Sequence, residues 1–290
     1  MAWARVRTWA GVLALAIATA GCASAPPATD IAAFGAAAKQ TTDLFRDAPV
    51  LGEELSAAIA EEVAARAYLE GRGTALPPVV GPLRDVARWR AAWKPKLDLL
   101  AAISAYADAL AEAADPAGPQ KVAAAGSNLV GTVFEVAQLD AGKEVAGVVA
   151  TLGKITIRAW TAREIRAAMA EVQPYLDAAG PLLAVDAAKT AALYRQYLRV
   201  WINRRQAVLV LVQGGSSRTE QYAAYEAAVA DARQWKARVE ALEQAGAVVE
   251  RLAAAHRKLL ENEFDAEAAI ADLKELAIQL KALGGALSGD

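Results

Sequence analysis

The 290-residue chain contains one Cys and one His, and this scarcity excludes several classes of protein. A single Cys forms no disulfide within the chain, and one Cys with one His cannot build a Cys/His metal site. The 31 basic residues are matched by 33 acidic ones, which leaves a net charge of only −2. Nucleic-acid binding usually requires a basic patch or stripe, so this balance predicts no nucleic-acid partner.

Cofactor motifs are also missing from the sequence. We find no phosphate-binding loop, no dinucleotide fingerprint and no Ser-x-x-Lys dyad, so we expect no cofactor and no metal. Apolar residues, in contrast, make up 56% of the chain, which is too many for a disordered protein. Alanine is the most frequent residue and the strongest helix former. The composition therefore predicts an Ala-rich, all-α protein.

The first 22 residues have the pattern of an export signal. Two arginines precede an apolar stretch from Trp9 to Ala20, which is too short to span a bilayer. The stretch ends in Thr19-Ala20-Gly21-Cys22, which resembles the lipobox of bacterial lipoproteins, with Thr19 where Leu is usual. The resemblance implies cleavage before Cys22 and acylation of its thiol and its new amine. Two or more acyl chains would make the membrane anchor stable.

The same resemblance implies a location. The residue after Cys22 is Ala23, not the Asp that favours retention in the inner membrane, so we expect the outer membrane of a Gram-negative cell, facing the periplasm. Ordinary secretory cleavage after Ala20 is the alternative. We therefore divide the chain into a signal peptide at 1–21, a lipid-anchored tether at 22–29 and a single helical domain at 30–290.

Apolar residues at helical spacing predict long helices in this domain. The expected ranges are about 30–70, 82–114, 120–138, 142–172, 181–212, 218–261 and 265–283. We predict an elongated antiparallel bundle of these helices, joined by Pro/Gly turns. Asp30 is the expected N-cap of the first helix, and Pro49 is expected to kink or break it. Tyr175–Gly180 is expected to be a joint, and Gly284-Gly285 is expected to end the last helix.

Two further patterns define the longest helices. Ser217 and Glu220 have the spacing of a capping box, which places a helix start after the Gly214–Ser217 turn. From Trp235 to Leu260, apolar residues alternate spacings of three and four, as in helices packed along their length. Val208–Val212 is an apolar run that also suits a buried strand, and we assign it to a helix because no partner strand is evident.

One helical stripe is the candidate partner-binding site. Tyr194, Tyr197 and Trp201 are spaced along one stripe of the 181–212 helix. Arg195 and Arg199 lie between these aromatic residues, and Arg204 and Arg205 follow them. Aromatic and arginine side chains are enriched at binding hot spots, so we predict a protein partner at this stripe. Packing of the aromatic residues in the core is the alternative.

Few residues are candidates for chemistry. His256 lies on the second apolar seam and is expected to be a packed, hydrogen-bonded histidine, with a general base or a pH sensor as the alternative. The pairs Glu53-Glu54 and Glu61-Glu62 are expected to form a solvated face, since adjacent helical residues make poor carboxylate dyads. Arg90 is expected to cover apolar surface or to pair with a neighbouring helix.

The sequence therefore predicts a non-enzymatic envelope lipoprotein that acts as a structural or protein-binding adaptor. It would contact the membrane through its N-terminal lipid and a protein through its long helical surface. One alternative is a membrane-active protein that rearranges the Gly/Ala-rich stretch 120–157, although charged residues interrupt every window of that stretch. A cell-envelope enzyme that uses His256 or the glutamate pairs is a further alternative.

Overall fold

The computed structural model describes residues 28–72, 84–113, 118–137, 162–214, 216–261 and 266–288. Within these ranges every regular element is an α-helix, which confirms the all-α prediction. The helices are α2 (Ala28–Leu69), α3 (Arg84–Ala111), α4 (Gly118–Ala137), α6 (Ala162–Val212), α7 (Arg218–Glu261) and α8 (Ala266–Ser288). The signal peptide and Cys22 lie outside the described residues, as do 138–161, which contain most of the expected 142–172 helix.

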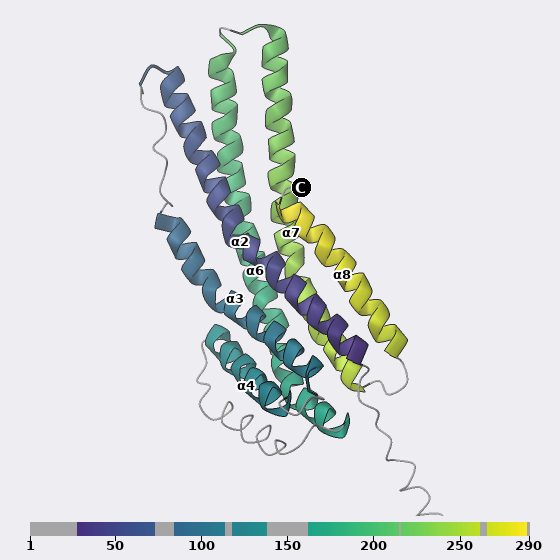
Figure 1. The fold of residues 1–290 in the computed structure, drawn as a ribbon. Coiled ribbons are helices and arrows are strands. Elements are labelled where there is room, and N and C mark those ends of the chain that lie inside the picture. The colour runs from purple at the N-terminus through teal and green to yellow at the C-terminus, as the bar shows by residue number, and fades with distance from the viewer. Residues whose placement is uncertain are drawn as a thin grey trace, which may run out of the picture.

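The helices form an elongated antiparallel bundle (Figure 1). α6 and α7 make the most extensive pairing and form a helical hairpin, while α2 packs against both. α3 lies between α2 and α4, and α8 packs against α2 and α7. The ends of α2, α6 and α7 extend past α3 and α8, and we call this extension the outer arm: residues 59–72, 202–214 and 216–237.

α6 is one continuous helix, so the predicted joint at Tyr175–Gly180 is wrong. α6 passes through both Pro174 and Pro181, each of which removes one helical hydrogen bond. The helix continues because its core-facing side is firmly packed: Val172, Leu176, Ala179 and Leu183 are all buried. α2 and α3 also continue through their prolines, Pro49 and Pro95, which excludes a break at Pro49.

The ends of two helices differ from the prediction. α2 begins at Ala28, so Asp30 is not an N-cap but a fully buried residue of the first turn. α8 continues through Gly284 and Gly285 to Ser288. The continuation has a physical reason, because Leu287 is buried and its carbonyl accepts a hydrogen bond of 2.6 Å from Arg238 Nε.

The start of α7 agrees with the prediction. The backbone N–H of Ser217 donates to Glu220 Oε2 at 2.7 Å, and the backbone N–H of Glu220 donates to Ser217 Oγ at 3.3 Å. These reciprocal bonds are those of a capping box, and they satisfy N–H groups that the first helical turn leaves free. Val208–Val212 is helical, as predicted.

Small residues let α6 and α7 approach closely in the body of the bundle. A Cβ atom added to Gly246 of α7 would lie 2.7 Å from the Cα of Ala184 on α6. A Cβ atom added to Gly180 of α6 would lie 3.1 Å from the Cα of Glu250 on α7. Gly180, expected to lie in a joint, therefore provides space for helix packing.

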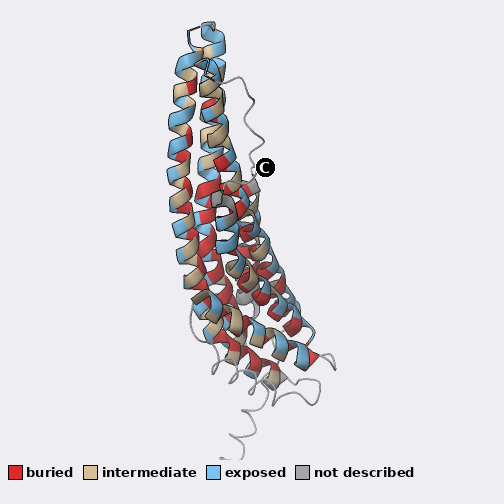
Figure 2. Ribbon diagram, turned by 90° about the vertical axis from the view of Figure 1, so that its left-hand side faces the viewer, coloured by how far each residue is buried: buried red, intermediate tan, exposed pale blue. Residues whose placement is uncertain are grey.

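The core lies in the body of the bundle, and it thins out in the outer arm (Figure 2). Among the described residues of 202–237, only Val208 and Ala228 are buried. On α2, the only buried residue past Ser56 is Glu62. The three helices of the outer arm therefore pack against one another with little apolar surface fully enclosed.

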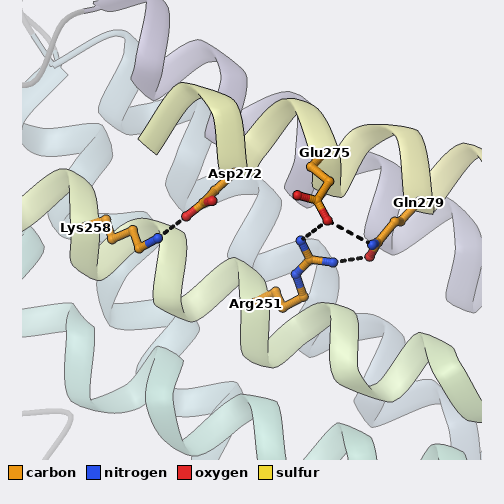
Figure 3. A network of polar contacts seen from close by, with 5 residues as sticks. All are labelled: Arg251, Lys258, Asp272, Glu275 and Gln279. Carbon is orange, nitrogen blue, oxygen red and sulfur yellow. Dashed lines mark hydrogen bonds and ion pairs between the residues drawn. The ribbon is translucent and has the colours of Figure 1, made fainter. Parts of the chain in front are cut away.

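Polar contacts hold α8 along α7 (Figure 3). The Arg251 guanidinium bonds to Gln279 and lies 3.3 Å from Glu275 Oε1 on α8. Closer to the α7–α8 connection, Lys258 pairs with Asp272. Both ion pairs are largely solvent-exposed, so each contributes little by itself and mainly fixes the register of the two helices.

Candidate functional site

The predicted stripe on α6 does not form one exposed surface. Tyr194 is fully buried, and its hydroxyl donates a 2.9 Å hydrogen bond to the carbonyl of Ala48 on α2. Trp201 is only 4% exposed and belongs to the core, and Tyr197 packs against that core while partly buried. Tyr194 therefore packs inside the bundle, which contradicts the prediction for that residue, whereas Trp201 is largely buried but also lines a cavity between α6 and α7.

The two arginines of the stripe have different environments. Arg204 is exposed and makes no ion pair within the described part of the chain. Arg205 is half-buried, and its Nη1 lies 3.1 Å from Glu62 Oε1 on α2. Arg205 therefore links two helices of the outer arm, while Arg204 remains on the surface.

Glu62 contradicts the prediction of a solvated acidic face. Its side chain is nearly enclosed, and one carboxylate oxygen has no hydrogen-bond partner. Burial raises the pKa of Glu62, and the nearby Arg205 guanidinium opposes that rise. Two of the other predicted glutamates also join helices, since Glu53 binds Arg90 of α3 and Glu54 binds Arg238 of α7.

Two small cavities, of about 190 and 140 Å³, lie between α6 and α7. They share Ile202 in their linings, so we describe them together as one groove. On α6 the groove extends from Arg195 to Leu209, and on α7 it extends from Glu240 to Tyr225. Trp201 and Arg205 of the predicted stripe contribute to this lining, as do Arg195 and Arg199, which interleave with its aromatic residues.

Most of the large apolar side chains that are exposed in the described part of the chain lie in the outer arm. Tyr225 is 57% exposed and lines the groove, and Tyr222 is 61% exposed one helical turn nearer the start of α7. Val210 is 65% exposed on α6, and Tyr68 is 71% exposed at the end of α2. Exposed apolar surface is typical of sites that bind another molecule when it is contiguous.

A separate polar cluster is buried in the body of the bundle, around His256 of α7. The His256 Nδ1 atom lies 2.6 Å from Gln173 Oε1 on α6, and its Nε2 atom lies 3.3 Å from the Tyr106 hydroxyl on α3. The amide nitrogen of Gln173 donates to Asp177 Oδ1 at 2.7 Å and to the Ala253 carbonyl at 3.2 Å. Because the Gln173 oxygen can only accept, Nδ1 carries the proton and Nε2 accepts from Tyr106.

This cluster has the electrostatics of a structural site. Burial lowers the pKa of His256 to about 3, although the Asp177 carboxylate acts in the opposite direction. Burial also raises the pKa of Tyr106. His256 is therefore neutral at pH 7, and both of its ring nitrogens are occupied by protein partners, which agrees with the packed histidine expected from the sequence.

Sequence reasoning missed the partners of His256. Gln173 is the polar residue in an apolar stripe of α6 that includes Met169, Val172 and Leu176. A lone amide in such a stripe is a signal for a buried hydrogen-bonding partner. Nothing in the spacing, however, shows which of the other helices supplies that partner.

The remaining predictions concern metals and membranes. The described residues contain no group of three or more His, Cys, Asp or Glu side chains that could hold a metal ion. None of the described helices is long and apolar enough to cross a membrane. In the stretch 120–157, the described part of α4 buries Val122, Leu129 and Val130 in the core.

Comparison with known proteins adds no relative. No protein family model, curated protein or solved structure matches the chain.

Proposed function

We propose that the protein is a non-enzymatic adaptor, anchored in the outer membrane of a bacterial cell by lipid on Cys22, that binds a protein partner through its outer arm. The observation that carries this proposal is the groove between α6 and α7, together with the exposed apolar residues of the outer arm, of which Tyr225 lines the groove. A surface of this kind is costly to leave in water, and a partner would cover it.

The shape of the molecule supports the proposal. α7 has 44 residues and therefore spans about 66 Å at 1.5 Å per residue. The start of α2 lies at the end of the bundle opposite the outer arm (Figure 1). An anchor that precedes α2 would hold the body near the membrane and leave the outer arm accessible to a partner.

The first experiment tests the partner. A photo-crosslinking amino acid replaces Gln206, which lines the groove, and in a matched variant it replaces Arg204, which is exposed on the same helix outside the groove. Irradiation of intact envelopes is expected to give one reproducible protein adduct from position 206 and none from position 204. Equal adducts from both positions, or none from position 206, would refute the adaptor proposal.

The second experiment tests the anchor independently. Mass spectrometry of the mature N-terminus is expected to show an acylated Cys22, and Cys22→Ala is expected to move the protein from the membrane to the soluble fraction. An unmodified N-terminus after Ala20 would show ordinary secretion instead. That result would remove the lipid anchor and leave the partner-binding proposal to be decided by the crosslinks.

A further inference from the structure

The groove between α6 and α7 is long enough for a short helix to lie along it. Arg195 and Leu209 are 14 residues apart on α6, or about 21 Å, which corresponds to about four helical turns. The α7 side of the groove includes the small side chains of Ala228 and Ala232. On the α6 side, Ile202 and Leu209 provide apolar contact. An amphipathic helix that binds such a groove places its apolar side chains at three- and four-residue spacing along it.

The charged residues that α6 contributes to the groove are all basic: Arg195, Arg199 and Arg205. From Ala187 to Val212, α6 contains Lys189, Arg195, Arg199, Arg204 and Arg205, and no Asp or Glu. Arg195 pairs with Glu243, and Arg205 pairs with Glu62. Arg199 lines the groove, is exposed, and makes no ion pair within the described ranges.

The α7 side of the groove adds one acidic residue to the described lining, Glu240. Its carboxylate lies 3.5 Å from the ammonium group of Lys236, which is one helical turn earlier on α7 and also lines the groove. Of the four basic lining residues, three pair with Glu243, Glu62 or Glu240, so Arg199 is the one unpaired charge among the described lining residues. An acidic ligand would gain a favourable interaction with Arg199, whereas a basic ligand would be repelled there.

We propose that this groove binds an amphipathic helix of a partner protein whose apolar face is flanked by acidic residues. The inference rests on the proposed adaptor function and specifies its ligand. Two copies of this chain that docked groove to groove would bring their α6 arginines together, which is unfavourable. A lipid surface would contact the protruding residues of the outer arm and leave the floor of the groove unfilled.

The test is a selection of peptides on the full mature protein. A displayed library presents 21-residue amphipathic helices with a fixed apolar face and randomised flanking positions. Selection is expected to enrich peptides whose flanks are rich in Asp and Glu. Enrichment of neutral or basic flanks, or no enrichment above the unselected library, would overturn the proposal.

Matched variants locate the binding site. Arg199→Glu reverses a charge on the rim of the groove, while Arg204→Glu makes the same change on the same helix outside the lining. The enriched peptides are expected to bind Arg199→Glu at least tenfold more weakly than wild type and to bind Arg204→Glu within twofold. Equal losses in the two variants would mean general charge attraction and would refute the site.

Two other occupants are outcomes of the same experiment. If the selected peptides fail to bind and sedimentation shows a dimer that Arg199→Glu alters, the groove pairs with a second copy. If anionic vesicles bind to the protein and compete with the peptides, the occupant is a lipid surface. A crosslink from position 206 without peptide enrichment would overturn the acidic-helix ligand while keeping the adaptor function.

Discussion

His256 makes the stability of the bundle sensitive to mild acid. Its imidazole is fully buried, with Gln173 on one ring nitrogen and Tyr106 on the other. Protonation of Nε2 would remove the acceptor that the Tyr106 hydroxyl uses and would place a positive charge in the core. We therefore expect His256→Gln, which cannot titrate, to alter how the free energy of unfolding depends on pH.

The magnitude follows from the two pKa values of His256. The imidazole titrates near pH 6.5 in the unfolded chain, and burial lowers its pKa to about 3 in the folded protein. The stabilising contribution is complete above pH 6.5 and is lost as the pH falls towards 3, because the unfolded chain binds the proton first. The loss relative to pH 7 is about 2 kcal/mol at pH 5 and about 3 kcal/mol at pH 4.

The measurement is urea unfolding of wild type and His256→Gln between pH 7.5 and 4. Contributions from the carboxylates cancel in the difference between the two proteins, and His256 is the only His in the chain. We expect wild type to lose about 2 kcal/mol more than His256→Gln between pH 7 and pH 5. Gln196→His, which adds an exposed imidazole, is the control and should follow wild type. Parallel curves for wild type and His256→Gln would refute the reasoning.

Two further predictions concern packing and charge. Gly246→Ala should destabilise the protein by about 1–3 kcal/mol because the added Cβ meets the α6 backbone. Gly131→Ala, in open space within α4, should instead stabilise the protein by up to about 1 kcal/mol. Thermal unfolding of the two variants measures both effects, and equal effects would contradict the close approach of α6 and α7 at Gly246. Arg205→Met should destabilise the protein by about 2 kcal/mol at pH 7, because it leaves the Glu62 carboxylate unpaired. The loss is smaller than for a fully buried ion pair because Arg205 is partly exposed. Because burial raises the pKa of Glu62, this loss should shrink as the pH falls and Glu62 takes up a proton, and a loss independent of pH would show that the carboxylate is not its cause.

Local sequence patterns predicted much of the fold. The capping box at Ser217 and the apolar seam from Val239 to His256 placed α7 correctly, because both depend on residues close together in the chain. The prolines of α6 led to the wrong prediction of a joint at Tyr175–Gly180, because the sequence shows only their local effect. A proline weakens a helix locally, but the packing of Leu176 and Leu183 against distant helices outweighs that cost.

The candidate site depended on contacts that the sequence does not show. The periodicity of α6 grouped Tyr194 with Arg204, but it does not indicate which side of the helix α2 covers. The groove is defined by residues of α6 and α7 that approach from opposite directions along the hairpin, such as Leu209 and Tyr225. Only the charge pattern of α6, basic and without acidic residues after Asp186, was visible beforehand.

Because the core is concentrated in the body of the bundle, the body and the outer arm should differ in their stability against local opening. Because few described residues of the outer arm are buried, the arm loses little enclosed apolar surface when it opens locally. Amide protons of 202–237 should therefore exchange with solvent well before those that follow Val239 in α7. A ligand that filled the groove would slow this exchange, since it would supply the packing that the arm lacks. The proposed binding region would then be the part of the bundle that a ligand stabilises most.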